Sequence, residues 1–290
     1  MDSINCMPLD KSILQPFIDN ALKEDVGDGD HTSLSTIPGA VQGEAQLLIK
    51  DEGVLAGIEV ALEIFKTVDP NLVVEVLLED GTEVKNGDIA LYVSGSVHAI
   101  LIAERLVLNT MQRMSGIAST TKRVVKALSG TKTQVLDTRK TTPGLRHLEK
   151  MAVRIGGGVN HRFGLYDMIL IKDNHVDYAG GILNAIGAAQ TYRQTKQLDI
   201  PIEIEVRNLT ELKEVLSVGE IDRILLDNFE LDHLKEAVKL IDGQFITEAS
   251  GGITEDNALE YANCGVDYVS MGSLTHSFKS LDMSLKALRS

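Results

Sequence analysis

Short apolar runs alternate with amphipathic stretches from Thr133 onward. The apolar runs read "TQVLDT", "DMILIK", "PIEIEV", "RILLDN", "ITEASG" and "DYVSMG". The stretches between them, such as "ILNAIGAAQTYRQTK" and "LTELKEVLSVGE", carry apolar residues at helical spacing. This alternation is typical of βαβ units, which build a parallel sheet with helices outside it. The expected fold class is therefore α/β. A (β/α) barrel is the leading architecture, and six strands are counted.

The segment before Thr133 shows a different pattern. "FIDNALKED" and "IEVALEIFKTV" predict helices, whereas "EAQLLIKDEG" predicts a strand. "LVVEVLLEDGTEVKNGDIALYVSGS" predicts two strands around a Gly/Asp/Asn turn, and a long helix follows from about Ala99. A chain of 290 residues can form one large domain or two ordinary ones. The change of pattern favours two.

The charge and the cysteines limit the function classes. The sequence has 28 Lys+Arg and 42 Asp+Glu, a formal net charge of −14, which argues against general binding to nucleic acid or an anionic membrane. No apolar stretch is long enough to span a membrane, and the first thirty residues do not form a secretory signal. Cys6 and Cys264 are far apart and have no zinc-type spacing, so they are expected to be free thiols in a reducing, cytoplasmic compartment.

Charged and small residues follow the predicted strands where each strand ends. In barrels of parallel strands, functional groups gather at these carboxyl ends. A separate Gly-rich segment, "GGGVNHRFG", adds a histidine and an arginine. Each of these residues alone has a plain structural explanation, but their coincidence at successive strand ends predicts a site for an anionic substrate. The candidates are Arg139, Lys140, His161, Arg162, Lys172, Glu205, Asp227, Ser250, Gly251, Gly252, Gly272 and Ser273.

Lys172 and the two glutamates near the end of "PIEIEV" carry the most specific expectations. Lys172 follows "MILI", a strand expected to be buried on both faces, and a buried ammonium is costly without a partner. It therefore either points into an anion site or has a depressed pKa suited to chemistry. Glu203 lies two residues before Glu205 and shares its face of a regular strand, so one of the two is expected to be a deeper structural partner.

The last two strand ends predict a phosphate site. "EASGGIT" and "SMGSLT" place small residues where backbone N–H groups can approach a ligand. Thr254 is expected to be the N-cap of the next helix, with Glu255 and Asp256 in its first turn. These carboxylates would repel a phosphate on the helix axis. The phosphate is therefore expected to be held by loop amides and hydroxyls.

Several linked motifs resemble the quinolinate phosphoribosyltransferase family. They are "AERLVLNTMQRMSGIAS", "DTRKTTPGLR", "EKMAVRIGGGVNHRFGLYDMILIKDNH", "IEIEV", "LLDNF", "EASGGIT" and "DYVSMGSLT", with "EDVGDGDHTS" near the start. The resemblance covers nearly the whole chain. A related molybdenum-transport-associated family shares the TRK and HR elements, but the "IKDNH" ending favours the quinolinate enzymes.

The resemblance implies an architecture and an assembly. The architecture is an N-terminal α/β sandwich over residues 1–115, rejoined by residues 276–290, and an open seven-stranded α/β barrel over residues 116–275. The assembly is a homodimer, with a higher oligomer left open, in which Arg105 of one subunit completes the site of the other.

The resemblance also implies an activity. Phosphoribosyl transfer from 5-phosphoribosyl 1-diphosphate to quinolinate, with decarboxylation, would give nicotinate mononucleotide, CO₂ and diphosphate in NAD biosynthesis. Mg²⁺ would accompany the diphosphate. The roles implied are quinolinate binding by Arg139, His161, Arg162 and Lys172, diphosphate contact by Lys140, oxocarbenium and Mg²⁺ stabilisation by Glu205 and Asp227, and further substrate binding by Thr138. Lys140 and Lys172 are counted with the two carboxylates as catalytic.

Three other readings remain open at this point. A Schiff-base aldolase or lyase would use Lys172 as its nucleophile. A related phosphoribosyltransferase would take a substrate other than quinolinate. A carrier module is suggested by the turn "DGTEVKNGD", which resembles the hammerhead turn of biotinyl and lipoyl domains. That turn has no modifiable lysine in an MKM or DKA tripeptide and is interpreted as scaffold.

Overall fold

A computed structural model describes residues 11–288 of the chain, in two compact units. Unit 1 contains residues up to Thr120, Pro143–Gly156 and Phe278 onward, and unit 2 contains Thr121–Thr142 and Gly157–Ser277. The chain thus passes from unit 2 into unit 1 at Pro143 and returns to unit 2 at Gly157. The sequence-based domain boundary near residue 115 remains a prediction. Cys6 lies outside the described residues.

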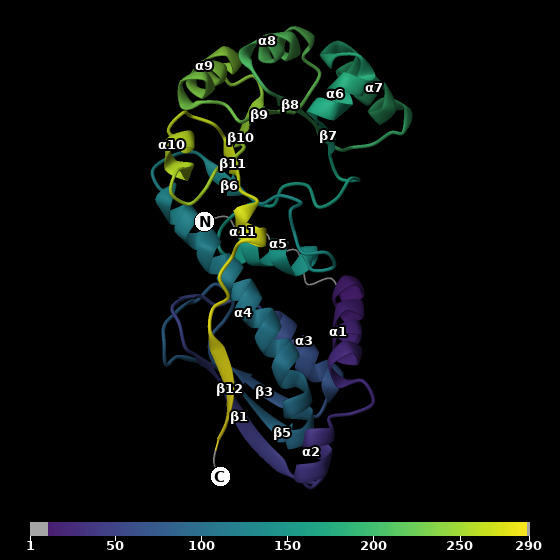
Figure 1. The fold of residues 1–290 in the computed structure, drawn as a ribbon, viewed down its shortest axis with the longest axis vertical. Helices are drawn as coiled ribbons and strands as arrows, with labels where there is room; N and C mark the ends of the chain where they lie inside the picture. The colour runs from purple at the N-terminus through teal and green to yellow at the C-terminus, as the bar shows by residue number, and fades with distance from the viewer. Residues whose placement is uncertain (1–10, 289–290) are drawn as a thin grey trace. The chain divides into compact units, whose positions relative to one another are not determined.

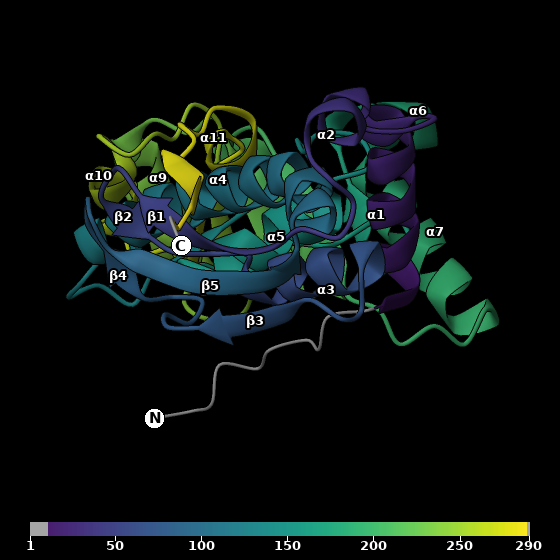
Figure 2. The ribbon, with the colours of Figure 1, turned by 90° about the horizontal axis from the view of Figure 1, so that it is seen from below.

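Unit 1 is built on a four-stranded antiparallel sheet in the order β12-β1-β5-β3. One face of β1 is buried through Ala45, Leu47 and Ile49. Helices α3 and α4 lie across a face of this sheet (Figure 2). The elements are α1 Lys11–Val26, α2 His31–Thr36, β1 Gln42–Ile49, β2 Gly53–Val54, α3 Ile58–Val68, β3 Val73–Val76, β4 Glu83–Val84, β5 Ile89–Ser96, α4 Val97–Ala127, α5 Arg146–Ile155 and β12 Met283–Ala287.

The sequence predicted α3 and β5 well but missed the last strand of this sheet. Strand β12 pairs with β1 along five residues, from Ala45 with Ala287 to Ile49 with Met283. The turn around Gly87 leads from β4 into β5, and β4 pairs with the short β2. The predicted pair of strands is therefore three strands, and two of them, β3 and β5, pair with each other.

Unit 2 is built on a parallel sheet in the order β6-β11-β10-β9-β8-β7. Helices α6 to α10 lie along its outer side (Figure 1). All five residues of β8 are buried, as a strand covered on both faces requires. The elements are β6 Gln134–Leu136, β7 Ile169–Ile171, α6 Asp173–Ala179, α7 Ile182–Thr195, β8 Ile202–Val206, α8 Leu209–Val218, β9 Arg223–Asp227, α9 Leu231–Ile241, β10 Ile246–Ser250, α10 Ala258–Ala262, β11 Tyr268–Ser270 and α11 Ser273–His276.

The strand order is that of a barrel opened between β6 and β7. Consecutive strands are neighbours from β7 to β11, and β11 pairs with β6. On the free side of β6, Val159 forms an isolated parallel bridge with Leu136. The N–H of Val159 donates to the carbonyl of Val135, and the N–H of Asp137 donates to the carbonyl of Val159. The six strands counted from the sequence are confirmed, and this bridge occupies the place of the seventh strand that the resemblance implied.

Two local differences from the sequence predictions are found near strand ends. A short helix, α6, begins directly after β7 and was not predicted. The helix expected to begin after Thr254 begins later, because Asn257 is the N-cap of α10. The Asn257 side chain accepts from the N–H of Thr254 at 2.7 Å and closes a turn there instead. Within residues 11–288, no helix is long and apolar enough to cross a membrane.

Candidate active site

Carboxylates from two neighbouring strands face a lysine at the carboxyl edge of the unit 2 sheet. The Lys172 ammonium lies 2.9 Å from a carboxylate oxygen of Glu205, at the end of β8. Asp227 ends β9, the next strand. Burial, and then the negative charge of Glu205, raise the pKa of Asp227 above its usual value. These two carboxylates therefore act on each other electrostatically, and a cation between them would relieve their repulsion.

Lys172 reaches this edge from the start of α6. Its N–H donates to Nδ1 of His175 at 2.9 Å, and its carbonyl accepts from the N–H groups of His175 and Val176. Its side chain is 48 % exposed, so the expectation of a buried ammonium was wrong. The reason is that β7 ends at Ile171, and Lys172 is already the N-cap of the helix. The partner of its ammonium is the Glu205 carboxylate, a contact that was not predicted from the sequence.

Two guanidinium groups lie near each other at the same unit. Arg139 follows β6 and is exposed, whereas Arg162 follows the Val159 bridge and is half-buried. Burial, and then the positive charge of Arg139, lower the pKa of Arg162. The Arg162 guanidinium also donates to the carbonyl of Met168 at 3.2 Å. A pair of guanidinium groups that repel each other favours an anion that can bridge them.

Lys140 lies beside the last strand end. The side chain of Lys140 packs against Gly272, so closely that a side chain on Gly272 would meet it. The Lys140 carbonyl accepts from the Thr275 hydroxyl at 2.9 Å, and its N–H donates to the Thr138 hydroxyl at 3.0 Å. Ser273 is the first residue of α11, directly after Gly272. The structure therefore brings Lys140, Gly272 and Ser273 together, as the convergence of strand ends predicted, and Thr138 lies with them.

The other predicted phosphate loop is shaped by Asn228, a residue that sequence reasoning missed. Gly251 and Gly252 both have left-handed backbones, with φ of +97° and +62°. The N–H of Asn228 donates to the Ser250 carbonyl at 2.8 Å, and its side-chain amide donates to Asp227 at 2.6 Å. Asn228 packs directly on Gly251, so a Cβ there would clash with its side chain and its backbone nitrogen. Asn228 thereby couples this loop to the Asp227 carboxylate.

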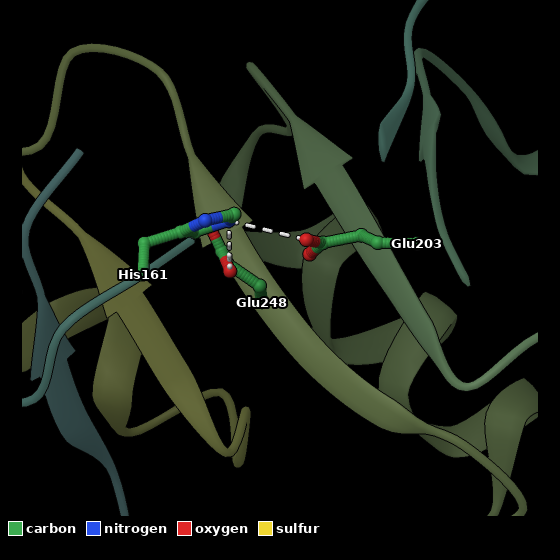
Figure 3. A group of neighbouring side chains, drawn as sticks. All are labelled: His161, Glu203 and Glu248. Atoms are coloured by element: carbon green, nitrogen blue, oxygen red, sulfur yellow. Dashed lines mark ion pairs between the residues drawn. The ribbon is translucent and has the colours of Figure 1, made fainter. Parts of the chain in front are cut away.

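His161 lies deeper, between two buried carboxylates (Figure 3). Its Nε2 is 3.1 Å from Glu203 and 3.4 Å from Glu248. Glu203 is fully buried and Glu248 is 1 % exposed. Glu203 is the deeper of the two glutamates on β8, which confirms the expectation that one of them has a structural partner. Glu248 was missed, although "ITEAS", like "IEIEV", carries a glutamate inside a strand that the sequence predicted.

The proton distribution in this cluster follows from its contacts. Burial lowers the pKa of His161, but the hydrogen-bonding carboxylates Glu203 and Glu248 more than offset this and raise it to about 9. Burial, and then the charge of Glu248, raise the pKa of Glu203 to about 7. The group therefore retains a proton in addition to the one a neutral imidazole carries. The backbone N–H of Arg162 donates to Nδ1 of His161 at 2.7 Å, so Nδ1 carries no hydrogen. The ring proton then lies on Nε2, and the additional proton lies on one of the two carboxylates, so the raised pKa belongs to the group of three and not to the ring alone.

Two predicted residues stand apart from these clusters. Arg105 is exposed on α4 and belongs to unit 1. Cys264 is a buried free thiol in unit 2, and burial raises its pKa. The roles assigned to the site residues from the sequence remain predictions.

Comparisons with known proteins cover both parts of the chain. Residues 30–115 match the family model described as the N-terminal domain of quinolinate phosphoribosyl transferase, and residues 117–286 match its C-terminal domain. The chloroplastic nicotinate-nucleotide pyrophosphorylase [carboxylating] of Arabidopsis thaliana is 47 % identical over 94 % of this chain and 82 % of its own length. The probable nicotinate-nucleotide pyrophosphorylase [carboxylating] of Bacillus subtilis is 43 % identical over 94 % of this chain and 92 % of its own.

Solved structures agree with these matches. The crystal structure of NadC from Streptococcus pyogenes superposes with a TM-score of 0.91 at 39 % identity, covering 97 % of this chain and 99 % of its own. The nicotinate-nucleotide pyrophosphorylase of Francisella tularensis gives a TM-score of 0.91 at 36 % identity, over 99 % and 100 % of the two chains. The similarity therefore extends over both units.

Proposed function

The chain belongs to the quinolinate phosphoribosyltransferase family, and from this premise we propose the activity that its site performs. It transfers the phosphoribosyl group of 5-phosphoribosyl 1-diphosphate to quinolinate with decarboxylation, giving nicotinate mononucleotide, CO₂ and diphosphate in NAD biosynthesis. The observation that carries this is the mutually repelling pair Arg139 and Arg162 in the same unit as the facing carboxylates Glu205 and Asp227. The arginine pair suits a dianionic substrate, and the carboxylate pair suits a positive charge that develops during the reaction.

The cationic part suits quinolinate. Its two ring carboxylates are planar anions, which guanidinium groups bind with two parallel hydrogen bonds. Arg139 and Arg162 would take these carboxylates, with Lys172 beside them. Binding of a dianion removes the repulsion that lowers the pKa of Arg162, so the substrate compensates a charge arrangement that is unfavourable when the site is empty of anions.

The carboxylate part suits the ribose. The bond from the anomeric carbon to diphosphate breaks as the quinolinate nitrogen forms its new bond, and positive charge builds on the ribose. Glu205 and Asp227 would stabilise that charge. Their two mutually repelling carboxylates also fit a divalent cation, and Mg²⁺, which takes oxygen ligands, would neutralise the diphosphate. Lys140, beside Gly272, would contact the same diphosphate.

The second step needs no nucleophilic side chain. Once alkylated, the ring nitrogen is a pyridinium. The electron pair of the bond to the adjacent carboxylate passes into the ring, CO₂ leaves, and a proton from solvent replaces it. The Schiff-base alternative requires a Lys172 amine that is free to attack a carbonyl, whereas Lys172 is engaged by Glu205 at 2.9 Å. The family match therefore stands without that alternative.

We further propose a homodimer with shared sites in a reducing, cytoplasmic setting. An exposed Arg105 on α4 is available to a partner subunit, and Cys264 is a free thiol. The direct test of the activity is to incubate the protein with quinolinate, 5-phosphoribosyl 1-diphosphate and Mg²⁺, and to measure CO₂ and nicotinate mononucleotide. Product from nicotinate but none from quinolinate would contradict the assignment.

Arg139→Ala or Arg162→Ala is expected to weaken the binding of quinolinate more than the binding of 5-phosphoribosyl 1-diphosphate. Each change removes a charge-assisted contact worth roughly 1.5–3 kcal/mol. Calorimetry with each substrate measures the two affinities separately. Arg207→Ala is the control, because Arg207 also follows a strand of this sheet but pairs with Glu211 at 2.7 Å. Equal losses for both substrates would show that the arginines do not select quinolinate.

Glu205→Gln and Asp227→Asn are expected to lower kcat on the order of a hundredfold, with little effect on quinolinate affinity. Their charge matters most when positive charge builds on the ribose. Steady-state kinetics at saturating quinolinate measure the effect. Asp256→Asn, in the exposed turn before α10, should keep the wild-type rate. If both site variants turn over normally, neither carboxylate stabilises the transition state.

A further inference from the structure

Beneath the carboxyl edge of unit 2 lies a layer of polar side chains from four consecutive strands. Glu203 on β8 and Arg223 on β9 are register partners, as are Glu248 on β10 and Tyr268 on β11. The Arg223 guanidinium lies 3.2 Å from Glu248 and 4.0 Å from Glu203, and it stacks over the Tyr268 ring at 4.7 Å. Arg223 therefore donates a hydrogen bond to Glu248, and its contact with Glu203 is a longer electrostatic one.

This polar layer contacts the His161 ring through its two carboxylates. Nε2 of His161 faces both Glu203 and Glu248 (Figure 3). The backbone N–H of His161 donates to Asp137 at 2.8 Å, and its Nδ1 accepts from the backbone N–H of Arg162 at 2.7 Å. The ring is therefore fixed at both nitrogens, and the Arg162 backbone is fixed through it.

The same three side chains could also hold a metal ion. His161, Glu203 and Glu248 place ligand atoms within 4.8 Å of one another. However, the Arg223 guanidinium already lies against the Glu248 oxygen that faces His161. A divalent cation there would meet the positive charge of Arg223 in a buried setting, where charge repulsion is strong. The Arg223 guanidinium therefore already supplies the positive charge that a bound metal ion would bring.

We propose that Glu203, Glu248 and Arg223 are positioning residues, which lock the His161 ring and, through Nδ1, the backbone of Arg162 in the geometry that binds quinolinate. The layer touches no substrate itself. This inference rests on the proposed function, since it assigns the layer to the quinolinate part of the site. It predicts that damage to the layer affects quinolinate and spares 5-phosphoribosyl 1-diphosphate.

The kinetic test compares Glu248→Gln and Glu203→Gln with Asp267→Asn. Asp267 also accepts partly buried hydrogen bonds, from the N–H and hydroxyl of Thr247, but it precedes β11 at the opposite edge of the sheet. The two glutamine variants should raise the KM for quinolinate at least about tenfold, the effect of losing one charged hydrogen bond. The KM for 5-phosphoribosyl 1-diphosphate should change by less than about twofold, which corresponds to about 0.4 kcal/mol. Asp267→Asn should lower the melting temperature without separating the two KM values.

A second measurement does not depend on activity. In protein with ¹⁵N-labelled histidine, long-range ¹H–¹⁵N spectra distinguish a ring nitrogen that carries hydrogen from one that does not, and His161→Gln assigns the signal. The wild type should show an unprotonated Nδ1, and Glu248→Gln should shift both ring nitrogens. If the wild type makes no product from quinolinate, the proposed function fails, while these spectra still test the layer.

Three results would overturn the proposal. One is a fall in melting temperature in the glutamine variants with both KM values unchanged, which would make the layer purely structural. Another is a His161 signal that does not respond to Glu248→Gln. The third is stoichiometric binding of Zn²⁺ or Mn²⁺ by the wild type that is lost in Glu248→Gln, which would make the cluster a metal site.

Discussion

Arg105→Ala and Lys172→Ala homodimers should each be nearly inactive, and a mixture of them should regain roughly a quarter of wild-type activity, as follows from two-fold symmetry and random pairing. Half of the dimers become hybrids. In each hybrid, one site combines the intact Lys172 of one chain with the intact Arg105 of the other, and the second site carries both lesions. Arg105 lies on α4 in unit 1, whereas Lys172 lies at the edge of the unit 2 sheet.

The control for this experiment is a mixture of Lys172→Ala and Arg162→Ala chains. Both residues belong to unit 2, so both are assigned to one subunit's own site. In each hybrid of that mixture, one site lacks Lys172 and the other lacks Arg162, so no activity should be recovered. A chain carrying both Arg105→Ala and Lys172→Ala, mixed with wild type, should also give hybrids with two inactive sites, because one site lacks Lys172 and the other lacks Arg105. Subunit exchange is verified by native mass spectrometry. If the mixture of Arg105→Ala and Lys172→Ala chains exchanges subunits but stays inactive, the shared site is refuted.

Gly251→Ala adds only one methyl group, yet it should destabilise the predicted phosphate loop and impair catalysis. The new Cβ would meet the side chain and the backbone nitrogen of Asn228, and overpacking of this kind costs about 1–3 kcal/mol. The left-handed backbone adds about 1–2 kcal/mol. Because Asn228 donates to Asp227, its displacement should raise the KM for 5-phosphoribosyl 1-diphosphate and lower kcat together.

Gly243→Ala is the matched control for Gly251→Ala. Gly243 also has a left-handed backbone, with φ of +71°, but a Cβ there would have open space. It precedes β10, at the amino edge of the sheet, away from Asn228. Urea unfolding should show a smaller loss for this variant, and its kinetics should remain those of the wild type. Equal kinetic effects in the two variants would show that backbone strain, and not the contact with Asn228, is responsible.

The sequence predicted those parts of the fold that depend on local pattern. "RILLD" is a short apolar run and "IEIEV" alternates branched apolar residues with glutamates, and both are bounded by helices, so the local pattern locates them. The last strand of the unit 1 sheet could not be predicted, because β12 is short and pairs with β1, which lies more than two hundred residues earlier. The place of Val159 was also hidden, since a single bridge has no periodicity.

The candidate site divides in the same way. Residues at strand ends could be listed, because parallel strands bring their carboxyl ends together. Arg223 could not be found by that rule, since it stands at the beginning of β9 and reaches Glu248 on the next strand. Lys172 was placed correctly but its burial was not, because the expected strand was one residue too long. Such contacts depend on register and on element ends, which apolar patterning does not specify.

The return of β12 to the unit 1 sheet has a consequence for synthesis on the ribosome. β12 is the last described element to leave the exit tunnel, yet its place is beside β1, one of the first. Until then, one edge of β1 exposes unpaired N–H and carbonyl groups, which can pair with other nascent chains. Residues 143–156 likewise reach unit 1 only after α4 has been made. A truncated product that stops before Met283 therefore presents an open edge to chaperones and proteases, and completion of the chain closes it.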